Sequence, residues 1–275
     1  GQPPRSSSSG GTVLRIHHLV CGTMRPLGVV PLVCHVLLLE HDDGLALVDT
    51  GYGTPDLARP SRLGTSRWTT GVRLDPGLTA VRQVERLGFA ASDVRDVVLT
   101  HMDYDHVGGL VDLPDALVHT TADELAATSA PASERRGSYR TATLQHRPRM
   151  RTYDGPGEPW RDGLTAHPVE GLDGVHLVPM PGHTRGHAVV AVDLPGGGLL
   201  VHAGDAAFDA SVYRSRTRDG RRLRPRRVLR LAERAIGEDR AALGRNHEAL
   251  ARLASHQDVE VFTAHDPRTF APPRR

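Results

Sequence analysis

Lysine is absent from this 275-residue chain, so all 34 of its basic side chains are arginine. Together with abundant alanine, glycine and proline, this bias is typical of a GC-rich genome and implies no particular function. Basic and acidic side chains nearly cancel, which leaves a formal net charge of +2. The densest arginine stretch, residues 214–230, contains no interleaved aromatic residue and is typical of a solvated surface, not of a nucleic-acid footprint. We therefore expect no nucleic-acid partner.

Cysteine and long apolar runs are also scarce. Cys21 and Cys34 are too few for a disulfide framework, which favours a reducing cytoplasm, although the sequence leaves a Cys21–Cys34 bridge open. No apolar run approaches the roughly 20 residues that a membrane span requires, so we expect a soluble protein and no membrane partner. The oligomeric state stays open, with a homodimer as one option.

The length permits one large domain or two small ones, each able to bury a core. Residues 1–11 read GQPPRSSSSGG, lack the apolar segment of a secretory signal and predict a flexible tail. We expect residues 12–275 to form a single domain. Within it, residues 131–162 are polar, contain proline and have weak periodicity, which predicts a long loop or a small cap over a site.

Strand patterns dominate the coarse secondary structure. Two apolar runs flank His41-Asp42-Asp43-Gly44, which predicts a β-hairpin. Several predicted strands precede each predicted helix, which favours packed sheets covered by helices, in the α+β class, over a parallel βαβ repeat. The predicted strands are 33–40, 45–49, 96–100, 116–119, 164–169, 175–178, 188–193, 199–202 and 259–263, and the predicted helices are 78–87, 122–127, 226–236 and 239–255.

Residues able to bind metal gather where predicted strands end. The segment from His101 to His106 follows a strand directly and contains His101, Asp103, Asp105 and His106 on one turn. Imidazole and carboxylate are ligands for zinc, iron, cobalt or manganese. The alternating spacing lets His101 and Asp103 point to one side of the turn and Asp105 and His106 to another. Taken alone, this H-x-D-x-D-H pattern also fits an exposed polar turn.

Three further strand edges favour a metal site over an exposed polar turn. His183 and His187 lie just before one predicted strand, Asp205 follows another, and His265 follows the last. Four separate strand edges that carry ligand-type residues predict one metal site. Isolated histidines such as His202 are expected to be packed or exposed residues without a metal.

Five motifs of the chain stand in the order found in the metallo-β-lactamase superfamily, which the sequence resembles from Val13 to Pro267. The resemblance implies a four-layer αββα sandwich with two metal ions at the sheet edge between the halves. The motifs are Leu47-Val48-Asp49-Thr50-Gly51, His101 to His106, Gly182-His183-Thr184 with Gly186-His187, Gly204-Asp205 and His265.

The resemblance also implies residue roles. Under it, His101, Asp103 and His183 hold the first metal, Asp105, His106 and His265 hold the second, and Asp205 bridges them. Asp49 and His187 are expected to orient ligands without binding metal themselves. This chain departs from the usual motif at Asp103, where the family has histidine. A carboxylate oxygen is a harder ligand than an imidazole nitrogen, so the identity of the metal stays open, with zinc as the first choice and iron or manganese as alternatives.

A metal-bridged hydroxide would attack a polarised carbonyl, and Asp105 would orient it and pass its proton to the leaving oxygen. The implied activity is a dinuclear metal-dependent hydrolase acting on a small molecule. A lactone or other carboxylic ester is the leading substrate class, because the chain's layout resembles the acyl-homoserine lactonases. The alternatives are a glyoxalase II-like thioesterase, a phosphodiesterase, and a protein of the same fold that binds metal or a small molecule without turnover.

Substrate-binding residues are harder to identify from the sequence. The lactonases carry a tyrosine three residues after the bridging aspartate, where this chain has Phe208. A missing hydroxyl could be replaced by Tyr104, Tyr139 or Tyr213. In the predicted cap, Tyr139, His146 and Trp160 supply aromatic and polar groups that could contact substrate.

Overall fold

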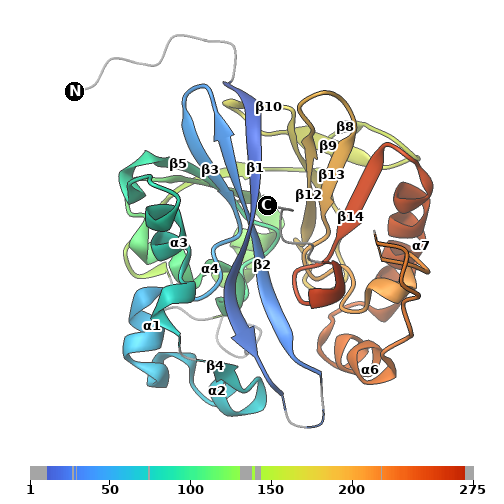
Figure 1. Ribbon diagram of the computed structural model, residues 1–275, viewed down its shortest axis with the longest axis horizontal. Helices are drawn as coiled ribbons and strands as arrows, with labels where there is room; N and C mark the ends of the chain where they lie inside the picture. Colours follow the sequence, from blue (N-terminus) through green and yellow to red (C-terminus); the bar gives the residue numbers. More distant parts are fainter. Residues whose placement is uncertain are drawn as a thin grey trace.

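The computed structural model describes residues 11–269, apart from residues 27, 29, 74, 131–137, 140–143 and 218. Two β-sheets face each other at its centre, and helices cover their outer faces (Figure 1). This is the α+β, four-layer αββα arrangement that the resemblance implied. The predicted tail lies outside the described residues except for Gly11, at which the first strand begins.

The first sheet combines an antiparallel meander with a run of parallel strands. The meander is β1-β2-β3, and β3, β5, β6 and β7 are parallel neighbours. Because parallel strands end at the same sheet edge, the loops after β3 and β5 meet there. The strands are β1 (Gly11–Met24), β2 (Leu32–His41), β3 (Gly44–Val48), β4 (Val72–Arg73), β5 (Val94–Val98), β6 (Leu117–Thr121), β7 (Arg149–Tyr153) and β10 (Leu172–Asp173).

The second sheet is antiparallel except at one edge, where β13 and β14 are parallel. Its strands follow the order β14-β13-β12-β11-β9-β8. The segments before β12 and after β13 and β14 therefore lie at one end of this sheet. The bounds are β8 (Glu158–Pro159), β9 (Thr165–Pro168), β11 (Val175–Pro179), β12 (Ala188–Asp193), β13 (Leu199–His202) and β14 (Val259–Phe262).

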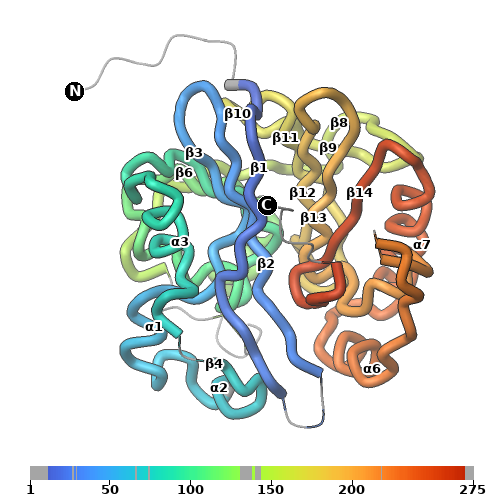
Figure 2. The backbone as a smooth tube through the Cα atoms, viewed as in Figure 1, coloured from blue at the N-terminus to red at the C-terminus, as the bar shows by residue number. Residues whose placement is uncertain are grey.

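Helices α1 to α3 lie beside the first sheet and helices α6 and α7 beside the second, as the tube trace makes clear (Figure 2). The helices are α1 (Thr54–Ala58), α2 (Ser66–Thr69), α3 (Ala80–Arg86), α4 (Tyr104–Val107), α5 (Ala122–Thr128), α6 (Arg227–Ile236) and α7 (Arg240–Ser255). Short 3-10 turns occupy Pro60–Leu63, Pro76–Leu78, Ala91–Asp93, Gly108–Asp112, Ala210–Val212 and Pro267–Thr269. In the ranges described, no helix is long and apolar enough to cross a membrane.

Three apolar layers hold the sandwich together. The central layer joins the two sheets and includes Leu37 and Val98 from the first and Val190 and Phe262 from the second. The outer layers pack the first sheet against α3 and α5 and the second against α7. Burial of apolar surface on both faces of each sheet explains the near-continuous apolar runs in β2 and β12.

The structure corrects the prediction for residues 131–162, which were expected to form a long loop or a small cap. Part of this segment forms β7, an edge strand parallel to β6, and part forms β8 in the second sheet. Residues 131–137 and 140–143 lie outside the described residues. The sequence obscured β7 because Arg149, Arg151 and Thr152 are exposed at the sheet edge, where little apolar patterning is required.

A buried ion network fastens the segments that follow β13 and β14. Asp209 and Asp266 are both fully buried, and Arg268 Nη2 lies 2.7 Å from Asp209 Oδ1 and 2.6 Å from Asp266 Oδ2. Arg230 Nε lies 2.9 Å from Asp209 Oδ2. Burial alone would raise the pKa of Asp209, but donors from the Arg226 backbone, Ser211 and Arg230 lower it to about 2. The two carboxylates therefore depend on their arginine partners.

We expect Arg268→Ala to lower the free energy of unfolding by about 3–5 kcal/mol, because it leaves two buried carboxylates without a shared partner. Urea denaturation at neutral pH measures this loss. Arg221→Ala is the matched control, since the Arg221 side chain is 83% exposed and pairs with Asp219 at the surface, and it should cost less than about 1 kcal/mol.

The difference in stability between the native protein and Arg268→Ala should depend on pH. Because the pKa of Asp209 is depressed, its contribution to stability is present above its unfolded pKa, near 4, and is lost as the pH falls towards 2. The stability difference between the native protein and Arg268→Ala should narrow over that interval. A difference that stays constant from pH 6 to pH 2.5 would contradict the assignment.

Candidate metal centre

Four chain segments bring seven predicted ligands together at one end of the sandwich. The loop after β5 and helix α4 carry His101, Asp103, Asp105 and His106, and the other three residues lie before β12, after β13 and after β14. All are buried except Asp105, whose side chain is 12% exposed. The fold thus joins residues that are up to 164 positions apart in the chain.

Oδ2 of Asp205 faces one half of the cluster. It lies 3.6 Å from His101 Nε2 and 3.3 Å from His183 Nε2. Asp103 Oδ2 lies 3.6 Å and 3.1 Å from the same two nitrogens. The four side chains therefore converge on one point, and His101, His183 and Asp205 form one of the groups able to hold a metal ion.

Oδ1 of Asp205 faces the other half. It lies 3.5 Å from His106 Nε2 and 3.1 Å from His265 Nε2. Asp105 Oδ2 lies 3.9 Å and 3.4 Å from these nitrogens. His106, Asp205 and His265 form a second group able to hold a metal ion. Asp205 is the carboxylate that both halves share.

These separations fit bound cations. Ligand atoms about 2.1 Å from a tetrahedral metal are about 3.4 Å from one another, which is the spacing seen in both halves. Two buried polar atoms, His101 Nε2 and Asp205 Oδ1, have no hydrogen-bond partner among the described residues. Buried polar atoms of this kind normally have partners, and two divalent cations would provide them.

The charges of the cluster favour cations as well. Burial lowers the pKa of His106, but the Asp205, Asp49 and Asp105 carboxylates raise it well above its usual range. Burial likewise opposes protonation of His265, yet Asp205 raises the pKa of His265 to about 9. The carboxylates thus create a strongly negative potential at the imidazole nitrogens, and metal binding would release protons from them.

Hydrogen bonds at the far ring nitrogens fix the direction of two imidazoles. His106 Nδ1 donates to Asp49 Oδ2 at 2.8 Å, and His265 Nδ1 donates to the Val33 carbonyl at 2.8 Å. Asp49 also accepts from the backbone and hydroxyl of Thr100, and its backbone has a positive φ of 59°. Each Nε2 lone pair is thereby directed towards the cluster.

Two further histidines hold the loop that carries Asp205. His187 Nε2 accepts from the Asp205 backbone N–H at 3.0 Å, and His202 Nδ1 accepts from the Gly204 N–H at 3.1 Å. Gly204 has a φ of 52°, and a Cβ there would lie 2.7 Å from His187 Nε2 and 2.8 Å from Thr100 Cβ. Only glycine fits this turn. The sequence did not assign His202 this contact, although its place beside Gly204-Asp205 was a usable signal.

Glu124 and Ser138 are contacts of the site that sequence reasoning missed. Glu124, fully buried on α5, accepts from the Met102 backbone at 2.8 Å and from the Thr184 hydroxyl at 2.7 Å, and so joins two loops that carry predicted ligands. Ser138 Oγ donates to Asp103 Oδ1 at 2.5 Å. Asp103 thus has one oxygen towards Ser138 and one towards the cluster.

The predicted substrate-binding residues do not all lie at the metal-binding cluster. Phe208 lies at the cluster, with its ring centroid 5.6 Å from that of His183 and 5.5 Å from that of His265. His146 is half-buried in the turn before β7, and its contact with substrate stays a prediction. Tyr139 is buried and donates its hydroxyl to Glu124, so this hydroxyl supports a ligand loop instead of a substrate.

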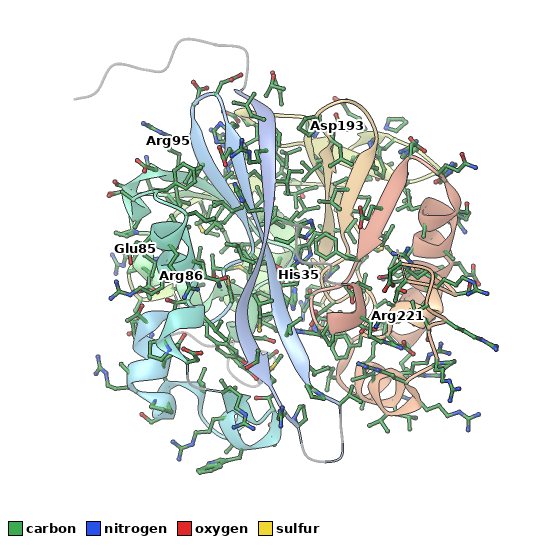
Figure 3. The ribbon with its side chains drawn as sticks, viewed as in Figure 1. His35, Glu85, Arg86, Arg95, Asp193 and Arg221 are labelled. Carbon is green, nitrogen blue, oxygen red and sulfur yellow. The ribbon has the colours of Figure 1, made fainter. Side chains whose placement is uncertain are left out.

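The prediction for Trp160 is wrong. Trp160 lies in a surface pocket with Asp193, Leu199 and Asp258, at the opposite end of β12, β13 and β14 from the cluster. Figure 3 labels Asp193 at the top of the view, well away from His35 on β2 near the middle. The error arose because β8 belongs to the edge of the second sheet instead of a cap.

An apolar cluster adjoins the metal-binding residues. Phe208 and Tyr104 belong to it, and Tyr104 immediately precedes the predicted ligand Asp105 in the chain. Its buried members are Met24, Leu32, Cys34, Tyr52, Leu63, Tyr104, Phe208 and Leu229. Both cysteines are free thiols, so the Cys21–Cys34 bridge that the sequence left open does not form.

Comparison with known proteins agrees with this geometry. Residues 29–244 match the family model described as the metallo-beta-lactamase superfamily. A probable metallo-hydrolase of Mycobacterium tuberculosis is 44% identical over 264 residues, which cover 94% of this chain and 83% of the relative. The N-acyl homoserine lactonase AttM of Rhizobium johnstonii is 24% identical, over 85% of this chain and 82% of the lactonase.

Solved structures show the same fold. An N-acyl homoserine lactone hydrolase, with the product N-hexanoyl-L-homoserine bound at its catalytic metal center, superposes with a TM-score of 0.68. The two chains are 18% identical, and the match covers 93% of this chain and 94% of that one. The chain belongs to the metallo-beta-lactamase superfamily and is a metal-dependent hydrolase.

Proposed function

We propose that this protein hydrolyses lactones or related carboxylic esters at a centre of two divalent transition-metal ions. The observation that carries the proposal is the division of the cluster around Asp205, with two imidazoles and one further carboxylate on each side. In this assignment His101, Asp103 and His183 hold the first ion and Asp105, His106 and His265 the second. Asp205 contributes one oxygen to each.

Zinc is the proposed metal, with iron or manganese as alternatives. Four imidazoles suit a borderline ion such as zinc, whereas the Asp103 carboxylate adds an oxygen ligand that iron and manganese also accept. When bound, two such ions activate water as a nucleophile and polarise the substrate carbonyl. The remaining chemistry belongs to residues of this chain.

Asp105 is placed to move a proton. It is the most exposed carboxylate of the cluster, and its Oδ2 lies 3.4 Å from His265 Nε2. A carboxylate at the edge of the site can hold the proton of the attacking water and pass it to the leaving alkoxide oxygen. Asp49, His187 and the Val33 carbonyl meanwhile keep the ligands oriented through the hydrogen bonds described above.

The apolar cluster supports an acyl or lactone substrate. Phe208 lies near both His183 and His265, so a bound ester would have an aromatic side chain beside it. Phe208 lacks a hydroxyl to donate to the ester carbonyl. Of the three tyrosines considered as replacements, Tyr139 donates to Glu124 and Tyr213 packs against the second sheet, whereas Tyr104 shares the cluster with Phe208. We assign the donor role to Tyr104.

The relatives support a lactone as the specific ester. Proteins named N-acyl homoserine lactonase are among those similar to this chain, and a solved structure with the same fold holds the ring-opened product N-hexanoyl-L-homoserine. A substrate panel of acyl-homoserine lactones, simple lactones, aryl esters, thioesters and phosphodiesters tests the proposal. Turnover of phosphodiesters or thioesters alone would contradict it.

We expect the purified protein to bind two equivalents of transition metal after expression with added zinc. Elemental analysis measures the ratio. Because cations bound at this site stabilise the folded state only, chelation should also lower the midpoint of thermal unfolding. Trace metal in protein that was supplemented during expression would count against the two-metal assignment.

Substitutions of the proposed ligands should lower kcat/KM to different extents. Asp205→Asn and His106→Ala should reduce kcat/KM by at least about 100-fold, since each removes a proposed ligand. Asp103→His should lose far less, because histidine supplies a nitrogen ligand at the same place. Metal content and esterase activity are measured on the same preparations. Tolerance of Asp205→Asn together with inactivation by Asp103→His would refute the ligand assignment.

The Tyr104 role predicts a selective loss. Tyr104→Phe should lower kcat for lactones on the order of 100-fold, as removal of a donor to the developing oxyanion does, with metal content unchanged. Tyr52→Phe is the matched control, because Tyr52 belongs to the same cluster and its ring centroid lies 6.0 Å from that of Tyr104. Equal losses in both variants would point to packing instead of catalysis.

A further inference from the structure

The thiol of Cys34 lies beside the second half of the metal-binding cluster. Cys34 is on β2 and is 2% exposed. Its Sγ, a carboxylate oxygen of Asp105 and a ring nitrogen of His265 all lie within 4.8 Å of one another, a spacing at which one cation could bind all three. Neither the ligand motifs of the chain nor the roles implied by its family resemblance include this cysteine.

Backbone hydrogen bonds hold the backbone around Cys34 at this place. The Val33 N–H donates to the His265 carbonyl at 3.3 Å, and the His35 N–H donates to the Ala264 carbonyl at 2.9 Å. His265 Nδ1 donates to the Val33 carbonyl. The residues on both sides of Cys34 therefore bond to the segment that carries His265. Main-chain pairing thus places the Cys34 backbone beside the cluster.

A second observation points to a cation at the same place. Asp205 Oδ1 is buried and makes no hydrogen bond within the described part of the chain, although His265 Nε2 lies 3.1 Å away and His106 Nε2 3.5 Å away. An acceptor without a donor, beside two imidazoles of which His265 also lies within 4.8 Å of the Cys34 thiol, has the surroundings of a metal ligand.

The other buried cysteine shows that burial alone does not produce this arrangement. Cys21, on β1, is fully buried in the layer between the first sheet and α3, where its Sγ accepts from Gln83 Nε2 at 3.3 Å. Cys21 belongs to none of the metal-binding groups found among the described residues. The chain thus contains its own control for any effect of a buried thiol.

We infer that Cys34 supplies a thiolate ligand to the second metal ion. The inference rests on the proposed two-metal function and makes its two positions chemically different. The first position offers nitrogen and oxygen ligands, including Asp103, whereas the second adds sulfur. On metal binding the S–H proton passes to solvent and a metal–sulfur bond forms, with no change of oxidation state. Because thiolates are soft ligands, the second position should favour zinc, cobalt(II) or cadmium over manganese or magnesium.

Cobalt(II) titration of the metal-free full-length protein tests the inference, in the presence of a phosphine reductant. The wild-type protein should develop an intense sulfur-to-cobalt charge-transfer band in the near ultraviolet by two equivalents. Cys34→Ser and Cys34→Ala should lack the band and bind one equivalent at least about 10-fold more weakly. Cys21→Ser should keep the wild-type band.

Two results would overturn the inference. One is two equivalents of bound cobalt with no charge-transfer band, which would leave the two-metal function intact. The other is a band that persists in Cys34→Ser. Failure to bind two equivalents at all would overturn the proposed function together with the inference.

A measurement on the wild-type protein alone guards against variants that do not fold. Cadmium-113 NMR of the doubly loaded protein should show two resonances, of which one is displaced far downfield by a sulfur ligand. Two resonances in the range of nitrogen and oxygen ligands would exclude Cys34 as a ligand.

Discussion

Burial of the Asp205 carboxylate is the constraint on which the rest of the site depends. An isolated buried carboxylate is costly, so its two oxygens must each have positive partners. The fold meets this need by bringing a pair of imidazoles to each oxygen from three other strand edges. Burial raises the pKa of Asp205, but His265, His106, His183 and His101 lower it well below its usual range. Stability and cation binding are therefore coupled in this chain.

The strands and the residues that gather in the cluster were predictable because their signals are local. The bounds of β12 (Ala188–Asp193) and β13 (Leu199–His202) agree with the apolar runs, and each ligand stands directly before or after such a run. The 14-residue β1 was not predicted, since its pattern has charged and histidine residues interspersed. The edge strand β7 was missed for the related reason that its side chains face solvent.

Residues that act through distant partners could not be found in the same way. Ser138 meets Asp103 across 35 positions, and Glu124 meets Thr184 across 60. Cys34 reaches His265 because β2 pairs with a segment more than 200 positions later. No periodicity or motif in the sequence encodes these meetings. Trp160 illustrates the converse error, in which a plausible side chain was assigned to the site although it follows β8 and lies at the other end of the second sheet.

Asp103 and Cys34 would change the net charge of the proposed metal centre in the same direction. In the proposed centre, Asp103, Asp105 and Asp205 would contribute three negative charges and a Cys34 thiolate a fourth, which together balance two divalent cations. A neutral cluster is less costly to bury than a positive one. A neutral centre would also polarise bound water less than a positive one. Hydrolysis would then depend more heavily on Asp105 as proton acceptor and on the Tyr104 hydroxyl that is proposed to donate to the carbonyl. Under the proposed assignment, Asp103 and Cys34 together would therefore favour an activated substrate such as a strained lactone ring over an unactivated amide.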